Sequence, residues 1–165
     1  MLPVFLDIEA SGFGKGSYPI EVGFILPDSK TYCTIIRRQP DWTHWDEQAE
    51  QLHGISREAL NEYGSDVVDV AKNLNYWLHG QVVYSDAWGN DCSWLALLFE
   101  CAGISQQFRL ETLRRLLTEA QAELWHTVKD QVIAGAESGR HRASTDAKIL
   151  QQTYQAVIAH SGHHS

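Results

Sequence analysis

The chain has 165 residues, of which 44% are hydrophobic and 21% are charged, so its size and composition suit one globular domain rather than a disordered chain. Its formal net charge of −8 argues against a long electrostatic track for duplex DNA, because proteins that bind many backbone phosphates are usually basic. No apolar run reaches membrane-spanning length, and the N-terminus lacks the layout of a secretion signal. Three cysteines without metal-finger spacing predict reduced thiols in a cytoplasmic protein.

The first part of the sequence predicts strands. Three runs are apolar or β-rich, and they comprise residues 3–9, 19–27 and 31–37. The glycines of residues 11–16 predict a turn after the first run, and residues 27–30 predict a hairpin-like connection between the other two. The stretch 46–62 then predicts two short helices that are broken at His53-Gly54.

The second part alternates helices with one strand. Residues 66–79 carry apolar side chains at helical spacing, and residues 81–86 predict a strand that ends in an acid. Further helices are expected at 90–102, 111–122, 122–134 and 144–160. This order predicts a mixed α/β sheet in a single domain of residues 1–160, with a flexible tail at 161–165. In such sheets, chemistry gathers where strand ends meet helix starts.

Two acids close the first predicted strand. Residues two apart on a strand point to the same side, so Asp7 and Glu9 would present their carboxylates together while Ile8 faces the other way. Like charges this close repel one another unless a cation lies between them. The triplet alone is common, and a solvated strand end also explains it.

Asp91 begins the predicted helix 90–102. It shares one stripe of that helix with five apolar residues, Trp94, Leu95, Leu98, Phe99 and Ala102. A carboxylate on this inward face is costly without a partner, which favours a metal ligand, although the helix dipole also favours an acid in a first turn. Asp86, at the end of the preceding strand, competes with Asp91 for this role.

The final predicted helix supplies another acid. Asp146 precedes Leu150 by four residues, on the side that we expect to be buried with Ile149, Tyr154, Val157 and Ile158. Ser144 can cap this helix, which leaves a structural role for Asp146 open. His141, in a loop that contains glycines, could reach a metal-bound water from its position five residues before Asp146.

These blocks resemble the DEDDh family, the DnaQ-like 3′–5′ exonucleases with a ribonuclease H-like fold. The first block, FLDIEASGFG at 5–14, is similar to the opening D-x-E-T/A-x-G motif of that family. The middle block at 82–95 resembles its second motif, and HRASTDAKIL at 141–150 resembles its H-x(4)-D motif. LHGIS at 52–56 is similar to its H-G-I-[ST] loop, and PIEVGFIL at 19–26 to its second strand.

The resemblance implies an α/β fold with a ribonuclease H-like, mixed five-stranded sheet flanked by helices. It implies a 3′–5′ exonuclease that releases 5′-mononucleotides from single-stranded or frayed DNA or RNA ends. Two Mg²⁺ or Mn²⁺ ions would serve each active site, because hard cations prefer carboxylate oxygens. Asp7 would bridge both ions, Glu9 and Asp146 would bind one, and Asp91 the other. His141 would take the proton of the attacking water.

The same resemblance implies substrate contacts from Ala10, Ser11, Gly12, Phe13 and Trp88. Arg142, a basic residue within the last motif, is a further candidate for a substrate phosphate, with a solvated surface charge as the alternative. Phe13 occupies a position that packs against the terminal bases, and stacking of a base on an aromatic ring tolerates every sequence. The expected partner is a single-stranded DNA or RNA 3′ end rather than a membrane. The family also allows a homodimer.

Several alternatives stay open from the residues. A ribonuclease H-like endonuclease would also use an acidic cluster, although it would not need the H-x(4)-D spacing. A catalytically inactive nucleic-acid-binding module could keep the same fold. Many family members carry Asn where this chain has Asp86, so Asp86 could share metal binding with Asp91. DNA and RNA differ at one sugar hydroxyl, so the sequence does not separate proofreading, RNA trimming and scavenging of short oligomers.

Overall fold

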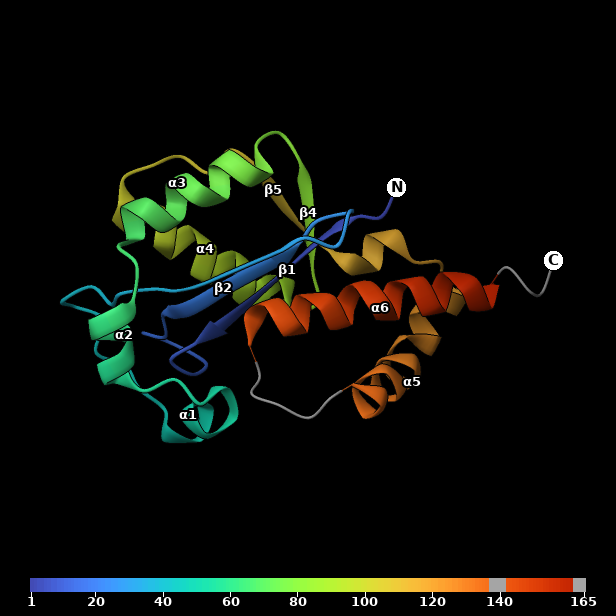
Figure 1. The fold of residues 1–165 in the computed structure, drawn as a ribbon, viewed down its shortest axis with the longest axis horizontal. Coiled ribbons are helices and arrows are strands. Elements are labelled where there is room, and N and C mark those ends of the chain that lie inside the picture. The colour runs from blue at the N-terminus through green and yellow to red at the C-terminus, as the bar shows by residue number, and fades with distance from the viewer. Residues whose placement is uncertain (137–141, 162–165) are drawn as a thin grey trace.

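The computed structural model describes residues 1–136 and 142–161, and its central element is a mixed five-stranded sheet (Figure 1). The strands are β1 (Val4–Ala10), β2 (Pro19–Ile25), β3 (Thr31–Ile35), β4 (Val82–Ser85) and β5 (Arg109–Thr112). Their order is β3-β2-β1-β4-β5; β2 pairs antiparallel with β1 and β3, whereas β4 pairs parallel with β1 and β5. This architecture confirms the predicted fold class, and it places β1 with its two acids at the centre of the sheet.

Helices cover both faces of this sheet. The described chain contains α1 (Glu47–His53), α2 (Arg57–Tyr63), α3 (Val67–Leu78), α4 (Trp88–Ala102), α5 (Glu119–Gly135) and α6 (Ala143–Ser161). Figure 1 shows α3 and α4 on one side of the sheet and α5 and α6 on the other. Two apolar clusters follow this division, one between the sheet and α3–α4, the other between the sheet and α5–α6. Burial of both faces explains why β2 is buried along its whole length.

The side chains of β1 alternate between these two clusters. Leu6 and Ile8 pack in the cluster of α3 and α4, whereas Phe5 packs in the cluster of α5 and α6. Because residues two apart share a face, Asp7 and Glu9 lie on the α6 side with Phe5. The predicted opposition of Ile8 to the two acids is therefore confirmed.

The two short helices predicted between residues 46 and 62 are also present. Gly54 ends α1 in the left-handed conformation with φ 69°, which a residue without Cβ adopts at little cost. Ser56 then starts α2, because its hydroxyl accepts a hydrogen bond from the Ala59 N–H. The break thus arises from local turn and cap chemistry.

Three predictions about local structure are wrong. Residues 111–122 do not form a helix: they include the end of β5, a 3₁₀ turn at Leu113–Leu116 and the start of α5. The β5 strand has only four residues and forms through its pairing with β4. It is too short for an alternation of apolar and polar residues to predict it from the sequence. Ser144 does not cap α6, because the helix already begins at Ala143. Ile158 is exposed rather than buried.

Other expectations concern exposure and the chain end. The three cysteines are free thiols, as predicted. None of the helices in the described part of the chain has the length and apolarity that crossing a membrane requires. Of the predicted tail at 161–165, only Ser161 lies within the described residues, and it is the last residue of α6.

Candidate metal centre

Three carboxylates meet beside the end of β1. One carboxylate oxygen from each of Asp7, Glu9 and Asp146 lies within 4.8 Å of the other two. Asp7 and Glu9 come from β1, and Asp146 comes from the first turn of α6. The structure therefore brings together three of the four acids that the sequence predicts to bind metal. Asp7 is partly exposed, but its Oδ2 is buried and has no hydrogen-bond partner among the described residues.

The position of Asp146 depends on strand β2. The fully buried Glu21 accepts a hydrogen bond from the Ala143 N–H at 2.6 Å and another from the Arg142 Nε at 2.7 Å. Two residues further along β2, a Cβ on Gly23 would lie 2.6 Å from the carbonyl carbon of Ala143, so only glycine lets α6 approach this closely. Strand β2 thus fixes where α6 begins, and Asp146 follows within its first turn.

Asp91 extends toward the site from α4, and a residue of β4 holds it in place. Its side chain is 1% exposed and accepts a hydrogen bond from the hydroxyl of Ser85, the last residue of β4. The same hydroxyl accepts a hydrogen bond from the Ala87 N–H at 3.1 Å, which ties the strand end to the start of α4. Asp91 lies outside the three-carboxylate group, but it lines the same pocket as Asp7 and Glu9.

Burial and mutual repulsion raise the pKa values of these acids. Burial raises the pKa of Asp7 well above its ordinary value, and the charges on Asp91, Asp146 and Glu9 add to the effect. Burial and a hydrogen bond to Asp146 raise the pKa of Glu9 to about 9. Burial raises the pKa of Asp91 to about 7, against the lowering effect of the Ser85 hydroxyl. A divalent cation among these oxygens would remove the repulsion, which is the electrostatic signature of a metal site.

Asp86, the competing carboxylate, has another partner. Its Oδ2 accepts a hydrogen bond from the Lys129 Nζ at 2.6 Å. It lies outside the three-carboxylate group, although it lines a cavity with Asp7 and Asp146. The geometry therefore places Asp86 beside the acidic centre with its charge offset by Lys129.

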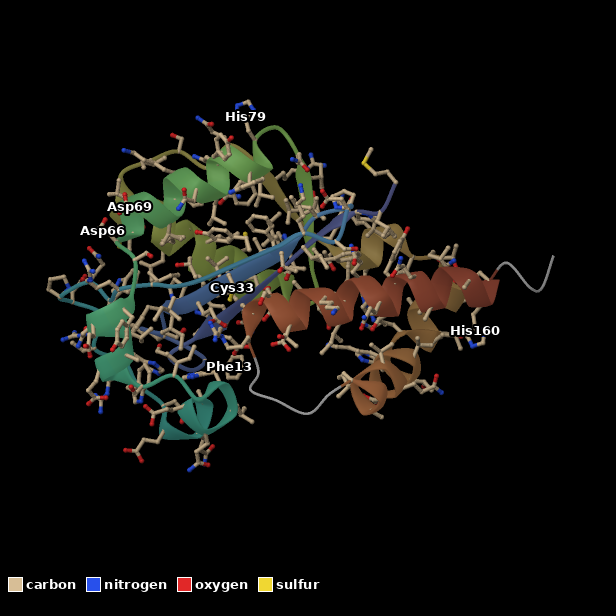
Figure 2. All side chains as sticks on the ribbon, in the orientation of Figure 1. Phe13, Cys33, Asp66, Asp69, His79 and His160 are labelled. Atoms are coloured by element: carbon tan, nitrogen blue, oxygen red, sulfur yellow. The ribbon has the colours of Figure 1, made fainter. Side chains whose placement is uncertain are left out.

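A pocket of about 210 Å³ opens next to the carboxylates. Its lining includes Ala10 at the end of β1, Gly12 and Phe13 from the loop after it, Ala49, Leu52 and His53 from α1, and Trp94 from α4. Phe13 is 71% exposed, and its ring centre lies 6.2 Å from that of Trp94. In the view of Figure 2, Phe13 projects between α1 and the start of α6. An exposed aromatic ring here offers a stacking surface for a base.

His53 is a feature of this pocket to which the sequence assigned no role. It is 1% exposed, and its Nδ1 accepts a hydrogen bond from the Ile55 N–H at 3.0 Å, so the ring proton of the neutral form sits on Nε2. Burial lowers the pKa of His53, which keeps the ring neutral. Its Nε2 has no partner among the described residues. The resemblance of LHGIS to a family loop was the signal that could have identified it.

The other predicted substrate contacts differ in their surroundings. Ser11 is buried, and its hydroxyl bonds His44 Nδ1 and accepts from the Tyr18 N–H, so it holds the loop. A Cβ on Gly12 would lie 2.7 Å from the Cε1 of His44, so glycine permits the close approach of this loop. Trp88 is 44% exposed and donates its Nε1–H to the Leu110 carbonyl.

Two further predicted residues precede α6 in the sequence. Arg142 is turned toward β2, where it pairs with Glu21 and lies 4.0 Å through Nη2 from the Cys33 Sγ, and Figure 2 shows Cys33 beside the start of α6. Arg142 therefore stays a predicted substrate contact, but in this structure its side chain is committed to β2. His141 lies outside the described residues.

No protein-family model and no curated protein matches this chain. Solved structures of exonuclease I match it in fold. The enzyme from Methylocaldum szegediense superimposes with a TM-score of 0.69 at 10% identity, covering 94% of this chain and 39% of that one. E. coli exonuclease I in complex with a dA16 oligonucleotide gives 0.70 at 13% identity, covering 96% and 40%. Its zinc-bound form in complex with single-stranded DNA gives 0.65 at 12% identity, covering 98% and 41%.

These similarities establish the fold. The five-stranded sheet and its flanking helices match the ribonuclease H-like domain of exonuclease I, so the predicted ribonuclease H-like architecture is confirmed. This chain spans about two fifths of the length of those exonuclease chains. At such low identity, function has to be argued from the residues of the site.

Proposed function

We propose that this chain is a metal-dependent 3′–5′ exonuclease that releases 5′-mononucleotides from single-stranded ends. The observation that carries the proposal is the convergence of Asp7, Glu9 and Asp146 from two separate elements. The Oδ2 of Asp7 is buried there and has no hydrogen-bond partner among the described residues. The pocket beside the carboxylates, lined by Phe13, His53 and Trp94 among others, supports an activity on chain ends. We call it the nucleotide pocket, because it offers room and an aromatic surface for one terminal nucleoside. The solved complexes of exonuclease I with single-stranded oligonucleotides support the same class of substrate.

The donor set fits hard divalent cations. Asp7, Glu9 and Asp146 would hold one ion, and Asp7 with Asp91 would hold a second, all through carboxylate oxygens that suit Mg²⁺ or Mn²⁺. Bound ions of this kind activate water and stabilise the negative charge that develops at a phosphodiester. The raised pKa values of the acids also fit, because a cation replaces the protons that otherwise relieve the repulsion.

The protein side chains would orient the terminal nucleotide. Its base would pack against Phe13, whose exposed ring needs no base-specific hydrogen bond. The Nε2–H of His53 would donate to a substrate oxygen, since the proton is held on that nitrogen by the Ile55 N–H. His141, predicted from its spacing to Asp146, would accept the proton of the attacking water.

The test uses 3′-labelled single-stranded DNA and RNA oligomers with Mn²⁺. We expect labelled 5′-mononucleotides as the first products, and an unchanged circular single strand, which excludes an endonuclease. Asp7→Asn keeps the shape of the side chain but removes its charge, and it should slow release about a thousandfold, since metal stabilisation is worth several kcal/mol. Calorimetry should show weaker Mn²⁺ binding by this variant.

Asp69→Asn is the matched control, because Asp69 is an exposed acid on α3 (Figure 2). It should retain full activity. Wild-type protein that releases no mononucleotide with Mn²⁺, or an Asp7→Asn variant with unchanged release, would contradict the proposed function. A circular single strand that is cut would favour the endonuclease.

A further inference from the structure

The nucleotide pocket is the first of three cavities that form a row. A second cavity of about 280 Å³, the middle pocket, is lined by Asp7, Asp146, Asp86 and Ile133 among others. A third of about 160 Å³, the arginine pocket, is lined by Asp86, Arg114, Trp125 and His126 among others. The middle pocket shares Asp7 and Ala87 with the nucleotide pocket, and it shares Asp86 with the arginine pocket. The outer two share no lining residue, so the middle pocket lies between them.

Arg114 gives the third cavity a cation that has no ion-pair partner among the described residues. Its side chain is exposed and makes no ion pair with the described residues. The adjacent Arg115 instead pairs with Glu111 at 3.3 Å, as Arg109 does at 3.1 Å. The guanidinium of Arg114 therefore keeps its full capacity for a phosphate, which arginine binds through paired N–H donors.

Two other features of this cavity also favour an anion. Trp125 is 3% exposed, and its Nε1–H, a donor that cannot accept, has no partner among the described residues. The carboxylate of Asp86 is offset by the Lys129 Nζ at 2.6 Å, so it does not cancel the charge of Arg114. Asp86 is the one acid among the described residues that line this cavity and it is paired with Lys129, so Arg114 gives the cavity a positive charge, whereas the chain as a whole carries a net charge of −8.

The order of the cavities matches the order of nucleosides and phosphates along a single-stranded substrate. With the terminal nucleoside in the nucleotide pocket, the scissile phosphate lies at Asp7 and its neighbours. The next nucleoside then enters the middle pocket, where Ile133 and Ile149 offer apolar surface. We infer that the arginine pocket binds the backbone phosphate on the 5′ side of that nucleoside, one nucleotide upstream of the cut. This inference rests on the proposed function and makes an oligonucleotide with at least two phosphates the preferred substrate.

The inference separates three small substrates. The p-nitrophenyl ester of thymidine 5′-monophosphate engages only the nucleotide pocket and the carboxylates. A thymidine dinucleotide with a 5′-hydroxyl reaches the middle pocket, and the same dinucleotide with a 5′-phosphate also reaches the arginine pocket. Wild-type protein should therefore cleave the 5′-phosphorylated dinucleotide with a kcat/KM roughly tenfold to a hundredfold higher than the unphosphorylated one, the range of a charge-assisted hydrogen bond.

Arg114→Ala tests the residue directly, and Arg115→Ala is its matched control. We expect Arg114→Ala to remove the advantage of the 5′-phosphate, mainly through KM, and to leave hydrolysis of the p-nitrophenyl ester unchanged. Arg114→Lys should retain part of the advantage, because it keeps the charge but not the fork of donors. Arg115→Ala should behave as wild-type protein on all three substrates.

The outcomes distinguish this inference from the proposed function. Wild-type protein that cleaves both dinucleotides equally well would overturn the phosphate site and leave the exonuclease intact. Arg114→Ala would do the same if it slowed the ester as much as the phosphorylated dinucleotide, because the residue would then act on the fold or the carboxylates. Wild-type protein that hydrolyses none of the substrates would overturn the exonuclease itself.

Discussion

Helices α4 and α6 each bring one acid toward the end of β1, but the chain anchors these two helices in different ways. In α4, the predicted metal ligand itself holds the helix start to the sheet, because Asp91 accepts a hydrogen bond from Ser85 of β4. The N-cap residue Ala87 provides no side-chain cap. In α6, a carboxylate other than the predicted ligand holds the helix start, because Glu21 of β2 accepts hydrogen bonds from the Ala143 N–H and from Arg142.

Because of this difference, Ser85 affects the protonation of Asp91, whereas Glu21 affects the position of Asp146. A hydrogen bond to Asp91 lowers its pKa and so partly offsets the cost of burying its charge. It also occupies one oxygen of a predicted metal ligand. Glu21 binds the start of α6 rather than Asp146 itself, so it helps to fix where the helix begins. We therefore expect changes on β2 to act through geometry and changes at Ser85 to act through protonation.

Among the changes that test how the two helices are anchored, Gly23→Ala should have the largest effect on rate. The added methyl group would meet the backbone of α6 at 2.6 Å and push the helix start away from β2. A displacement of about 1 Å at a catalytic group can cost about a hundredfold in rate, and overpacking costs about 1–3 kcal/mol of stability. Rates on a 3′-labelled oligomer and urea unfolding measure the two effects.

Gly135→Ala is the control for this change, because among the described residues no atom outside the local helix backbone lies within 4 Å of the Cβ that it adds. It should leave rate and stability close to the wild-type values. A Gly23→Ala variant with wild-type Mn²⁺ affinity and rate would show that α6 does not need this close contact.

Changes at Glu21 should have a smaller effect that depends on the hydrogen bond. Glu21→Ala leaves the Ala143 N–H without its acceptor and should weaken Mn²⁺ binding about tenfold to a hundredfold, the usual range for residues that support a metal ligand. Glu21→Gln keeps an oxygen for that N–H and should recover most of the affinity. Mn²⁺ calorimetry on both variants measures this, with Glu62→Ala, an exposed acid on α2, as the control.

Equal losses of affinity in Glu21→Ala and Glu21→Gln would attribute the effect to the ion pair with Arg142 instead. In that case Arg142→Ala should reproduce it, because the pair between Glu21 and Arg142 would be lost from the other side.

Ser85→Ala should act through charge at Asp91. Without the hydroxyl, the pKa of Asp91 rises above about 7, so at a given pH less of it is ionised and able to bind a cation. The acid limb of the pH–rate profile should shift to higher pH, with a loss of about tenfold near neutrality. The loss should disappear at alkaline pH, whereas a loss that persists there would indicate displacement of α4.

The metal-free protein should lose stability as the pH rises. The pKa of Glu9 is raised from 4.5 to about 9, so above pH 4.5 the unfolded chain releases this proton while the folded protein retains it. The contribution of Glu9 to the free energy of unfolding is therefore most favourable below pH 4.5. It decreases as the pH rises toward 9, by at most about 1.4 kcal/mol per pH unit for one proton. Urea unfolding in EDTA at several pH values measures this slope.

Two comparisons sharpen this prediction. Glu9→Gln removes the titrating group and should flatten the slope. Mn²⁺ should raise stability more at high pH than at low pH, because the ionised carboxylates bind it. A slope of the opposite sign in wild-type protein would mean that burial does not raise the pKa of Glu9.

The sequence by itself determined the residues whose positions follow from a local period. Strand alternation placed Asp7 and Glu9 on one face with Ile8 opposite, and the helical stripe through Trp94 and Leu98 placed Asp91 inward. The proximity of Asp146 to the acids of β1 also followed, through its motif. These predictions succeed because the backbone geometry of one strand or helix fixes the relative directions of nearby side chains.

Only the tertiary structure decided which distant residues support those acids. Glu21 meets Ala143 across 122 residues of sequence, and Ser85 meets Asp91 only because the start of α4 turns back on β4. The β5 strand and the row of cavities, from Phe13 to Arg114, likewise arise where separate elements pack together. No local pattern encodes such pairings, because they depend on the sheet order and helix placement that burial of both faces selects.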